Sequence, residues 1–293
     1  MMVNRRQWMA GGAALATTLA AGPLMARRGG GKLGPIGLQL YTVRAIFEPD
    51  PMGTLEKVAA IGYREVEYGG GGYQKMDHSA LRKKMGRLGL VSPSIHAGYD
   101  ALTSNFDGVV KMTKTLGADT VILPWVGPAL RNTEAWKSAL ANFSRWAEQL
   151  RKEGLGFAYH NHDFEFTIKT GSTSRFDMLV AETDPALVKI ELDLFWTIAA
   201  GEDPKAIIKR LPGRIYAYHV KDRTADGKMT SVGNGVVDFA DIFTLNKMAG
   251  VKHFYVENDQ SPPPYLPDIQ TSFKTISRLR AQVAIRGSIH GSN

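Results

Sequence analysis

Four polar residues in the second half of the chain recur at the spacing of a repeated strand–helix unit, each in an apolar segment. They are Glu165 in 157–166 (FAYHNHDFEF), Asp193 in 188–193 (VKIELD), His219 in 215–220 (IYAYHV) and Glu257 in 254–257 (FYVE). Consecutive members lie about 25 to 40 residues apart, the length that a strand, a helix and two loops require.

Residues at the carboxyl ends of parallel strands meet on one face of a sheet or barrel, so these four side chains are expected to cluster. Three carboxylates and one imidazole suit a single divalent cation such as Mn²⁺, Mg²⁺, Co²⁺ or Zn²⁺. Without a cation the carboxylates would repel one another, and some would take up protons. The pattern therefore predicts a metal-assisted reaction site.

The elements that must position this site follow from hydrophobic periodicity between residues 34 and 283. Strands are predicted at 36–41, 65–68, 91–96, 120–125, 156–160, 188–193, 215–220 and 254–257. Helices are predicted at 54–61, 79–88, 106–116, 133–153, 176–182, 204–210, 240–248 and 269–279. Eight strands, each followed by a helix, predict an α/β fold of the (β/α)8 TIM barrel type.

An open, doubly wound sheet is the alternative, but it usually carries a Gly-rich phosphate turn after its first strand. Here that strand is followed by 41–44 (YTVR), and the run 69–72 (GGGG) follows the second strand, where it predicts a flexible loop at the barrel mouth. Three regions are expected: an export signal and linker at 1–31, the barrel at 32–285, and a disordered tail at 286–293.

Composition is that of a folded globular protein, with 44% hydrophobic and 22% charged residues and no cysteine. The formal charge of +8 includes Arg5, Arg6, Arg27 and Arg28, all in the first 31 residues. The remaining basic residues form no stripe with interleaved aromatic residues, so no nucleic-acid partner is expected.

The amino terminus carries Arg5-Arg6 ahead of an uncharged, Ala/Gly-rich stretch at 10–26. This pattern resembles a twin-arginine export signal and predicts a periplasmic protein. The stretch is too short and too rich in glycine for a stable span, so no membrane-spanning segment is expected after processing.

The ends of the predicted strands also supply candidate substrate contacts. They are Gln39, Tyr41, Glu67, His96, Trp125 and His160, joined by Trp196 shortly after the sixth strand. The aromatic members would line an apolar face of the bound substrate.

Together, the segments GLQLYTVR (37–44), YHNHDFEF (159–166), ELD (191–193), HVKD (219–222) and VEND (256–259) resemble the sugar phosphate isomerase/epimerase family, the xylose-isomerase-like barrels. The resemblance runs from residue 34 to about residue 280. It implies a small-molecule carbohydrate substrate and one divalent cation held by Glu165, Asp193, His219 and Glu257, and it leaves open a homo-oligomer. His160 and His162 lie nearer the strand than Glu165, and either could be a substrate contact or a ligand.

The implied chemistry is removal of a proton next to a carbonyl through an enediolate that the cation stabilises. Glu165 and Glu257 are expected to act in acid–base steps as well as in metal binding, with help from His162 and Lys221. This favours a sugar isomerase or epimerase acting on a free sugar or keto-sugar. A dehydratase or lyase of an inosose or a 3-keto-glycoside is the alternative, partly because Trp196 stands where related ketose epimerases carry a histidine. A non-catalytic sugar-binding barrel is the second alternative.

Overall fold

The structure is a computed structural model that describes residues 34–289, with side chains as far as Arg280. The predicted export signal lies outside the described residues, as do positions 290–293 of the expected tail. Residues 286–289 belong to a helix, so the folded part extends four residues past the expected boundary.

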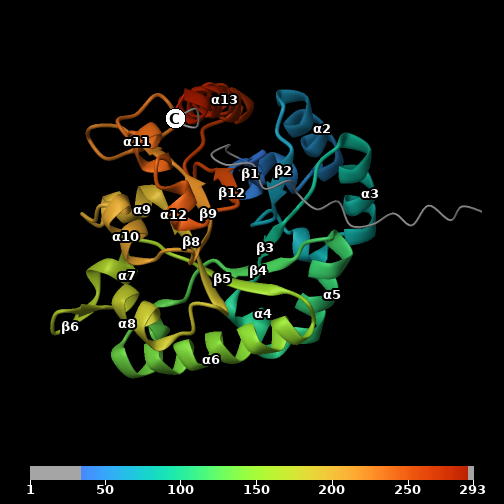
Figure 1. The fold of residues 1–293 in the computed structure, drawn as a ribbon. Coiled ribbons are helices and arrows are strands. Elements are labelled where there is room, and N and C mark those ends of the chain that lie inside the picture. The colour runs from blue at the N-terminus through green and yellow to red at the C-terminus, as the bar shows by residue number, and fades with distance from the viewer. Residues whose placement is uncertain (1–33, 290–293) are drawn as a thin grey trace, which may run out of the picture.

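One sheet of eight parallel strands forms the centre of the molecule (Figure 1). Its order in space is β2-β1-β12-β9-β8-β5-β4-β3. Isolated parallel bridges, Glu65 with Val91 and Tyr68 with Ile95, join the two outer strands and close the barrel. The strands are β1 (Ile36–Gln39), β2 (Glu65–Glu67), β3 (Ser94–His96), β4 (Thr120–Leu123), β5 (Gly156–His160), β8 (Val188–Asp193), β9 (Ile215–Val220) and β12 (His253–Val256).

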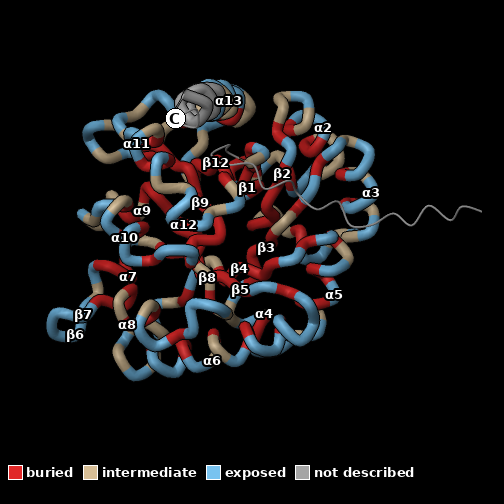
Figure 2. The backbone as a smooth tube through the Cα atoms, in the orientation of Figure 1, coloured by how far each residue is buried: buried red, intermediate tan, exposed pale blue. Residues whose placement is uncertain are grey.

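Helices surround the barrel, and the buried strands lie inside an outer layer that is exposed on its far side (Figure 2). The helices are α1 (Arg44–Phe47), α2 (Pro51–Ile61), α3 (His78–Leu88), α4 (Tyr99–Ser104), α5 (Phe106–Leu116), α6 (Thr133–Lys152), α7 (Phe164–Thr167), α8 (Arg175–Glu182), α9 (Leu194–Ala199), α10 (Pro204–Arg210), α11 (Phe239–Phe243), α12 (Asn246–Ala249) and α13 (Leu266–Ile289). Short 3₁₀ turns are η1 (Leu40–Val43), η2 (Tyr73–Lys75) and η3 (Pro128–Leu130), and two small hairpins pair β6 (Lys169–Thr170) with β7 (Thr173–Ser174) and β10 (Asp222–Arg223) with β11 (Met229–Thr230).

The predicted barrel is confirmed, and the predicted strands at 156–160, 188–193 and 215–220 match β5, β8 and β9 to the residue. The first strand is shorter than expected because the Gln39 side chain accepts a hydrogen bond from Tyr41 N and starts the turn η1. The helix predicted at 240–248 is two short helices, α11 and α12. Short helices that come directly after β3, β5 and β8, namely α4, α7 and α9, were not predicted.

Alternation along the strands divides each strand's side chains between the helix-facing core and the barrel interior. On β8, for example, Ile190 and Leu192 pack in the main hydrophobic core, whereas the buried side chains of Glu191 and Asp193 lie on the barrel-interior side. A separate small apolar cluster lies in the interior, and it includes two consecutive residues of β9 where the register with β8 is irregular: Ile122, Ala158, Tyr216, Ala217 and Tyr255. The interior positions beyond this cluster, toward the strand ends, are polar, which is where function in such barrels is built.

Candidate functional site

A cavity of about 500 Å³ opens at the carboxyl ends of the strands. It is lined by Tyr41, Gly69, Gly70, Gln74, His96, Gly98, Pro124, Trp125, His160, His162, Lys221, Glu257 and Asp259. This set includes most of the predicted site residues, drawn from both ends of the chain. The cavity lies where the active sites of parallel α/β barrels are found.

His160, Asp193, His219 and Glu257 come together beside this cavity, where His160 and Glu257 line it and Asp193 and His219 are fully buried, and we call them the mouth group. His219 Nδ1 lies 2.7 Å from Glu257 Oε2 and 3.8 Å from Asp193 Oδ2, and His160 Nε2 lies 3.8 Å from Asp193 Oδ2. Asp193 Oδ2, His219 Nδ1 and Glu257 Oε2 are buried and have no hydrogen-bond partner. Buried polar atoms are normally hydrogen-bonded, so three ligand-type atoms that make only ion-pair contacts, with one another and with Lys221, fit a cation site.

Local structure explains why only one carboxylate oxygen of Asp193 accepts a hydrogen bond. It is the residue that caps α9, and its Oδ1 accepts the backbone N–H of Trp196 at 2.8 Å. Its own N–H donates to Asn161 Oδ1 at 3.0 Å. The cap fixes the carboxylate, and Oδ2 remains directed at the mouth group.

Lys221 places a positive charge beside the mouth group. Its Nζ forms ion pairs with Asp193 Oδ2 at 3.0 Å and with Glu257 Oε2 at 2.7 Å. It also donates hydrogen bonds to both oxygens of Asp259, each at 3.0 Å. An ammonium group thus balances the carboxylates.

The charges set the protonation of this site. Burial acts to lower the pKa of Lys221, but Asp193 and Glu257 outweigh burial and hold that pKa well above its usual range. Burial acts to raise the pKa of Glu257, but the charges of Lys221 and His219 outweigh burial and hold that pKa well below its usual range. Burial raises the pKa of Asp193 to about 6, because the same charges offset only part of it.

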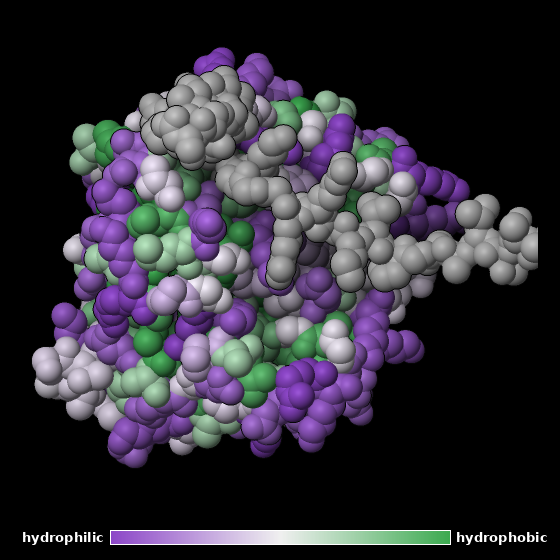
Figure 3. Space-filling view, in the orientation of Figure 1, coloured by the Kyte–Doolittle hydropathy of each residue, from purple (hydrophilic) through white to green (hydrophobic). Residues whose placement is uncertain are grey.

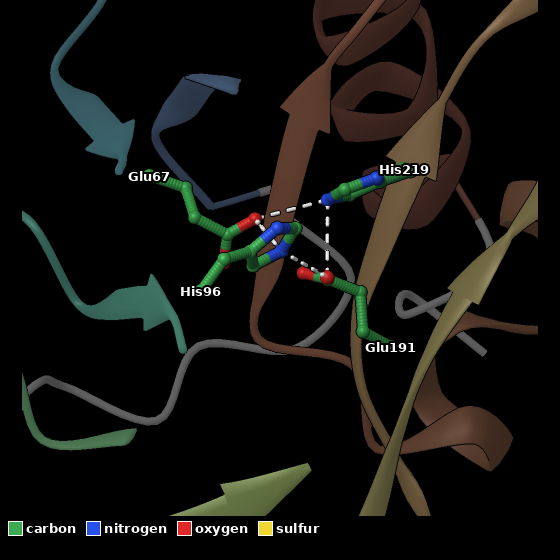
Figure 4. Close-up of side chains that lie close together, drawn as sticks. All are labelled: Glu67, His96, Glu191 and His219. Atoms are coloured by element: carbon green, nitrogen blue, oxygen red, sulfur yellow. Dashed lines mark hydrogen bonds and ion pairs between the residues drawn. The ribbon is translucent and has the colours of Figure 1, made fainter. Parts of the chain in front are cut away.

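A second cluster, the interior group, lies one layer deeper and consists of Glu67, His96, Glu191 and His219 (Figure 4). Each residue offers one ligand-type atom, all within 4.8 Å of one another. The Nε2 atoms of His96 and His219 each contact both carboxylates, at 2.9 to 3.1 Å. Nitrogen and oxygen therefore alternate around the cluster.

His219 joins the two groups, because its Nε2 faces the interior carboxylates and its Nδ1 faces the mouth group. Burial acts to lower the pKa of His219, but the carboxylates of Glu191 and Glu257 outweigh burial and raise that pKa well above its usual range. A cation bound at Nδ1 would therefore displace a proton. With a proton kept on Nε2 by the interior carboxylates, Nδ1 is the nitrogen left to act as a ligand.

Other interior contacts hold Glu67 in place. Gln39 Nε2 donates to its Oε2 at 2.7 Å, and the Ser94 hydroxyl donates to its Oε1. Burial acts to lower the pKa of His96, but the Glu67 carboxylate outweighs burial and raises that pKa to about 9. Gln39, Glu67 and His96, which the sequence suggested as substrate contacts, thus make a network with one another, and of the three only His96 lines the cavity.

Glu165, predicted as a ligand and catalytic acid–base group, is not brought to either group. The strand expected to carry it ends at His160, and Glu165 lies in α7. Its Oε1 accepts from the Tyr159 hydroxyl at 2.5 Å and its Oε2 accepts from the backbone N–H of His162 at 2.8 Å. Burial raises the pKa of Glu165 to about 8. Its geometry is that of a buried support for the loop after β5, and His160 lies at the place that the sequence assigned to Glu165.

His162 and Trp196 lie beside each other near the cavity, with ring centroids 5.6 Å apart. His162 lines the cavity, and its buried Nδ1 has no hydrogen-bond partner. Burial and the charge of Lys221 lower the pKa of His162 to about 3, which keeps the imidazole neutral. Tyr41 and Trp125 line the same cavity at its exposed edge.

Two polar residues at the site were not predicted from the sequence. Glu191 contacts His96, His160 and His219, and Asp259 receives the hydrogen bonds of Lys221. Alternation could have found Glu191, which lies two residues before Asp193 and therefore shares its side of the strand. Asp259 comes after the last strand, where the direction of the side chain depends on the loop.

Comparison with known proteins adds a family match. A model described as the xylose isomerase-like TIM barrel matches residues 55–274, which is more than half of the chain. A curated protein named inosose dehydratase, from Clostridium beijerinckii, is 29% identical over 154 residues, which are 45% of this chain and 49% of that protein. The chain thus spans about half the length of this relative.

Solved structures with the same fold cover more of the chain. A sugar phosphate isomerase/epimerase from Parabacteroides distasonis is 25% identical, with a TM-score of 0.68 over 83% of this chain and 96% of that one. A protein named IolI, crystallised with a zinc atom, is 15% identical, with a TM-score of 0.67 over 85% of this chain and 99% of that one. At that identity the IolI likeness shows the fold alone.

Proposed function

Since the chain belongs to the xylose isomerase-like TIM barrel family, we propose that it is a divalent-cation-dependent lyase that removes water from a cyclic polyhydroxy ketone. The observation that carries the proposal is the convergence of ligand-type atoms without hydrogen bonds, from Asp193, His219 and Glu257, beside a sugar-sized cavity that Glu257 lines. The name of the inosose dehydratase relative supports this reaction class over simple isomerisation.

The mouth group is proposed to hold the cation, through His160, Asp193, His219 and Glu257. These side chains come from β5, β8 and β9 and from the end of β12, neighbouring strands in the sheet, so the barrel itself fixes their spacing. Compared with the set expected from the sequence, His160 takes the place of Glu165. A divalent cation at this position acts as a Lewis acid that polarises a ketone oxygen and lowers the barrier to enolisation.

The remaining groups of the cavity fit the proton transfers of an elimination. His162 is neutral and lines the cavity, so its imidazole can accept the proton of the carbon next to the ketone. Lys221 supplies fixed positive charge beside the carbonyl end of the reaction. The C–H bond and the C–O bond of the next carbon break, a C=C bond forms, and the removed proton converts the departing hydroxyl into water.

An isomerase or epimerase, which the sequence placed first, shares the proton removal and differs in the fate of that proton. The Parabacteroides distasonis structure, by its name, supports this second candidate. It would return the proton to the same or the neighbouring carbon, with no loss of water. Trp196 has no titratable group and cannot return the proton to carbon. We therefore favour elimination over isomerisation or epimerisation.

The test is turnover of an inosose in deuterated water with Mn²⁺, Co²⁺, Mg²⁺ or Zn²⁺ added singly. A lyase yields a product lighter by one water, with the ultraviolet absorbance of a conjugated ketone. Glu257→Gln is expected to lose at least about a thousandfold in kcat/KM, whereas Glu165→Gln should retain most activity. A product of unchanged mass that carries deuterium would replace the lyase with an isomerase. Binding without deuterium exchange would favour the non-catalytic sugar-binding barrel.

We also propose that the amino-terminal segment directs export, which motivates the choice of unphosphorylated substrates. The support is the Arg5-Arg6 pair and the uncharged stretch after it. Full-length chain found in the cytoplasmic fraction, with none in the periplasm, would reject this proposal.

A further inference from the structure

Tyr41 and Trp125 are the only Phe, Tyr or Trp side chains that are exposed among the described side chains, residues 34–280. Their exposed fractions are 37% and 45%. Both line the cavity that also holds His160 and Lys221. Exposed large aromatic rings cost solvation free energy, so their joint position at one cavity rim indicates a ligand rather than chance.

An arginine holds each ring in place. The Arg44 guanidinium lies 3.9 Å from the centre of the Tyr41 ring, and its Nη atoms donate to the backbone oxygens of Tyr41 at 2.7 Å and Asp259 at 3.2 Å. The Arg131 guanidinium lies 4.9 Å from the centre of the Trp125 ring and donates twice to Val126 O, at 3.2 and 3.1 Å. Rings fixed in this way lose little conformational entropy when a ligand stacks on them.

The cavity is larger than the proposed reaction needs. One six-membered ring over the mouth group would occupy only part of about 500 Å³, a volume within the range of sites for drug-sized ligands. The remaining space runs continuously to the rim where the two aromatic rings lie.

The chemistry of the rim favours a second sugar ring over a phosphate. Lys221 is the only lysine or arginine among the cavity-lining residues, and its hydrogen bonds go to Asp259. Arg44 and Arg131 donate to backbone oxygens. Gln74 and Asp259, which also line the cavity, offer polar partners for hydroxyl groups. An aromatic surface with neutral and acidic polar neighbours suits the C–H face and the hydroxyls of a sugar.

We propose that Tyr41 and Trp125 form a subsite for a second ring, so that the substrate is a keto-sugar carried in a glycoside. This proposal adds a substrate class to the proposed lyase, and it rests on that proposed function for the reaction itself. The departing group is then the second sugar: the C–O bond to it breaks in place of the C–OH bond, and it leaves as an alcohol with the proton taken from carbon.

The test compares an inosose with the 3-keto form of a disaccharide as substrates of the full chain with its cation. The wild type is expected to favour the two-ring substrate by at least about tenfold in kcat/KM. Trp125→Ala and Tyr41→Ala should each lower the preference, which is the ratio of kcat/KM for that substrate to kcat/KM for the inosose, about tenfold. Trp125→Phe should retain most of the preference, and Met248→Ala, at 45% exposure outside the cavity lining, should change neither substrate.

Equal losses on both substrates in the two alanine variants would overturn the subsite. Turnover of the inosose with no preference for the disaccharide would also overturn it, while leaving the lyase assignment intact. Calorimetry measures the binding of unoxidised cellobiose and of glucose, and this measurement does not depend on turnover. If no substrate turns over but cellobiose binds at least about tenfold more tightly than glucose, and this difference depends on Trp125, then the lyase fails and the second-ring subsite stands.

Discussion

At the scale of single residues, the site depends on which polar groups have partners and which do not. His219 separates two environments: its Nε2 contacts the carboxylates of Glu67 and Glu191 at 2.9 and 3.1 Å, whereas its Nδ1 contacts only the mouth group, with Glu257 Oε2 at 2.7 Å and no hydrogen bond of regular geometry. Glu165 is as deeply buried as His219, yet both of its oxygens are occupied. Burial alone therefore does not identify a ligand, and the unpaired atoms do.

This contrast predicts opposite effects at two neighbouring positions. His160→Ala should lower the affinity for Mn²⁺ or Zn²⁺ by at least about tenfold, because it removes one of the proposed ligands. Glu165→Gln should bind the cation within about twofold of the wild type. Elemental analysis and calorimetry measure both. The reverse result, with loss only in Glu165→Gln, would restore the ligand set expected from the sequence.

Glu165 should also make stability depend on pH in a defined direction. Burial raises its pKa from 4.5 to about 8, so the folded protein keeps a proton that the unfolded chain releases. The resulting stabilisation is complete below pH 4.5 and is lost as the pH rises to about 8, on the order of 5 kcal/mol in all.

Urea unfolding of the wild type and Glu165→Gln between about pH 5 and 8 measures this effect. The free energy of unfolding of the wild type should fall relative to that of the variant as the pH rises, because glutamine cannot ionise. A difference that stays constant over this interval would show that Glu165 has an ordinary pKa in the folded state.

At the scale of elements, short segments immediately after the strands determine where the side chains point. The loop after β2 has Gly70, Gly71 and Gly72 at φ of +71°, +61° and +67°, a conformation that favours glycine. A Cβ at Gly70 would lie 2.6 Å from Cδ2 of the Tyr41 ring, so this loop also packs against a residue of the cavity.

Gly70→Ala is therefore expected to lower kcat/KM for the two-ring keto-glycoside about tenfold or more, because the backbone is strained and the Tyr41 ring must move. Gly89→Ala is the matched control: its φ is +68°, but nothing lies within 4 Å of the added Cβ. Both variants should lose about 1 to 2 kcal/mol of stability, measured by thermal unfolding. Only Gly70→Ala should lose activity, and equal activities would reject a role for the loop in shaping the site.

At the scale of the whole molecule, the barrel brings residues from distant parts of the chain into one buried cluster of charge. The face shown in Figure 3 is mainly hydrophilic, with hydrophobic side chains in small groups. Among residues 34–289, no helix is long and apolar enough to cross a membrane. The charge that the fold must accommodate lies inside, where the buried side chains of Asp193, Glu257 and Lys221 meet.

Cation binding should therefore stabilise the entire barrel. At about 100 times its Kd, a cation that binds only the folded state adds about 2.7 kcal/mol, or roughly 5 to 10 °C in Tm for a domain of this size. Calorimetric scans with Mn²⁺, Co²⁺, Mg²⁺ and Zn²⁺, each against a chelator, measure the shift. Asp193→Ala should show little shift, and an unchanged Tm of the wild type with every cation would contradict the proposed site.

The repeat of strands and helices could be read from the sequence, since hydrophobic periodicity is a local property of each segment. It predicted the barrel, the bounds of β5, β8 and β9, and the presence of Asp193, His219 and Glu257 near strand ends. These residues share a side of the barrel because alternation along a regular strand is independent of what surrounds it.

Only the tertiary structure decided which polar groups meet. The position of Glu165 away from the mouth group depends on the helical turn of α7 and on the hydrogen bonds that Glu165 makes with Tyr159 and His162. The contact of Glu191 with histidines of β3 and β9 depends on the register of strands that are far apart in sequence. Partners across a barrel are set by its closure, and that information is not contained in any single segment of the chain.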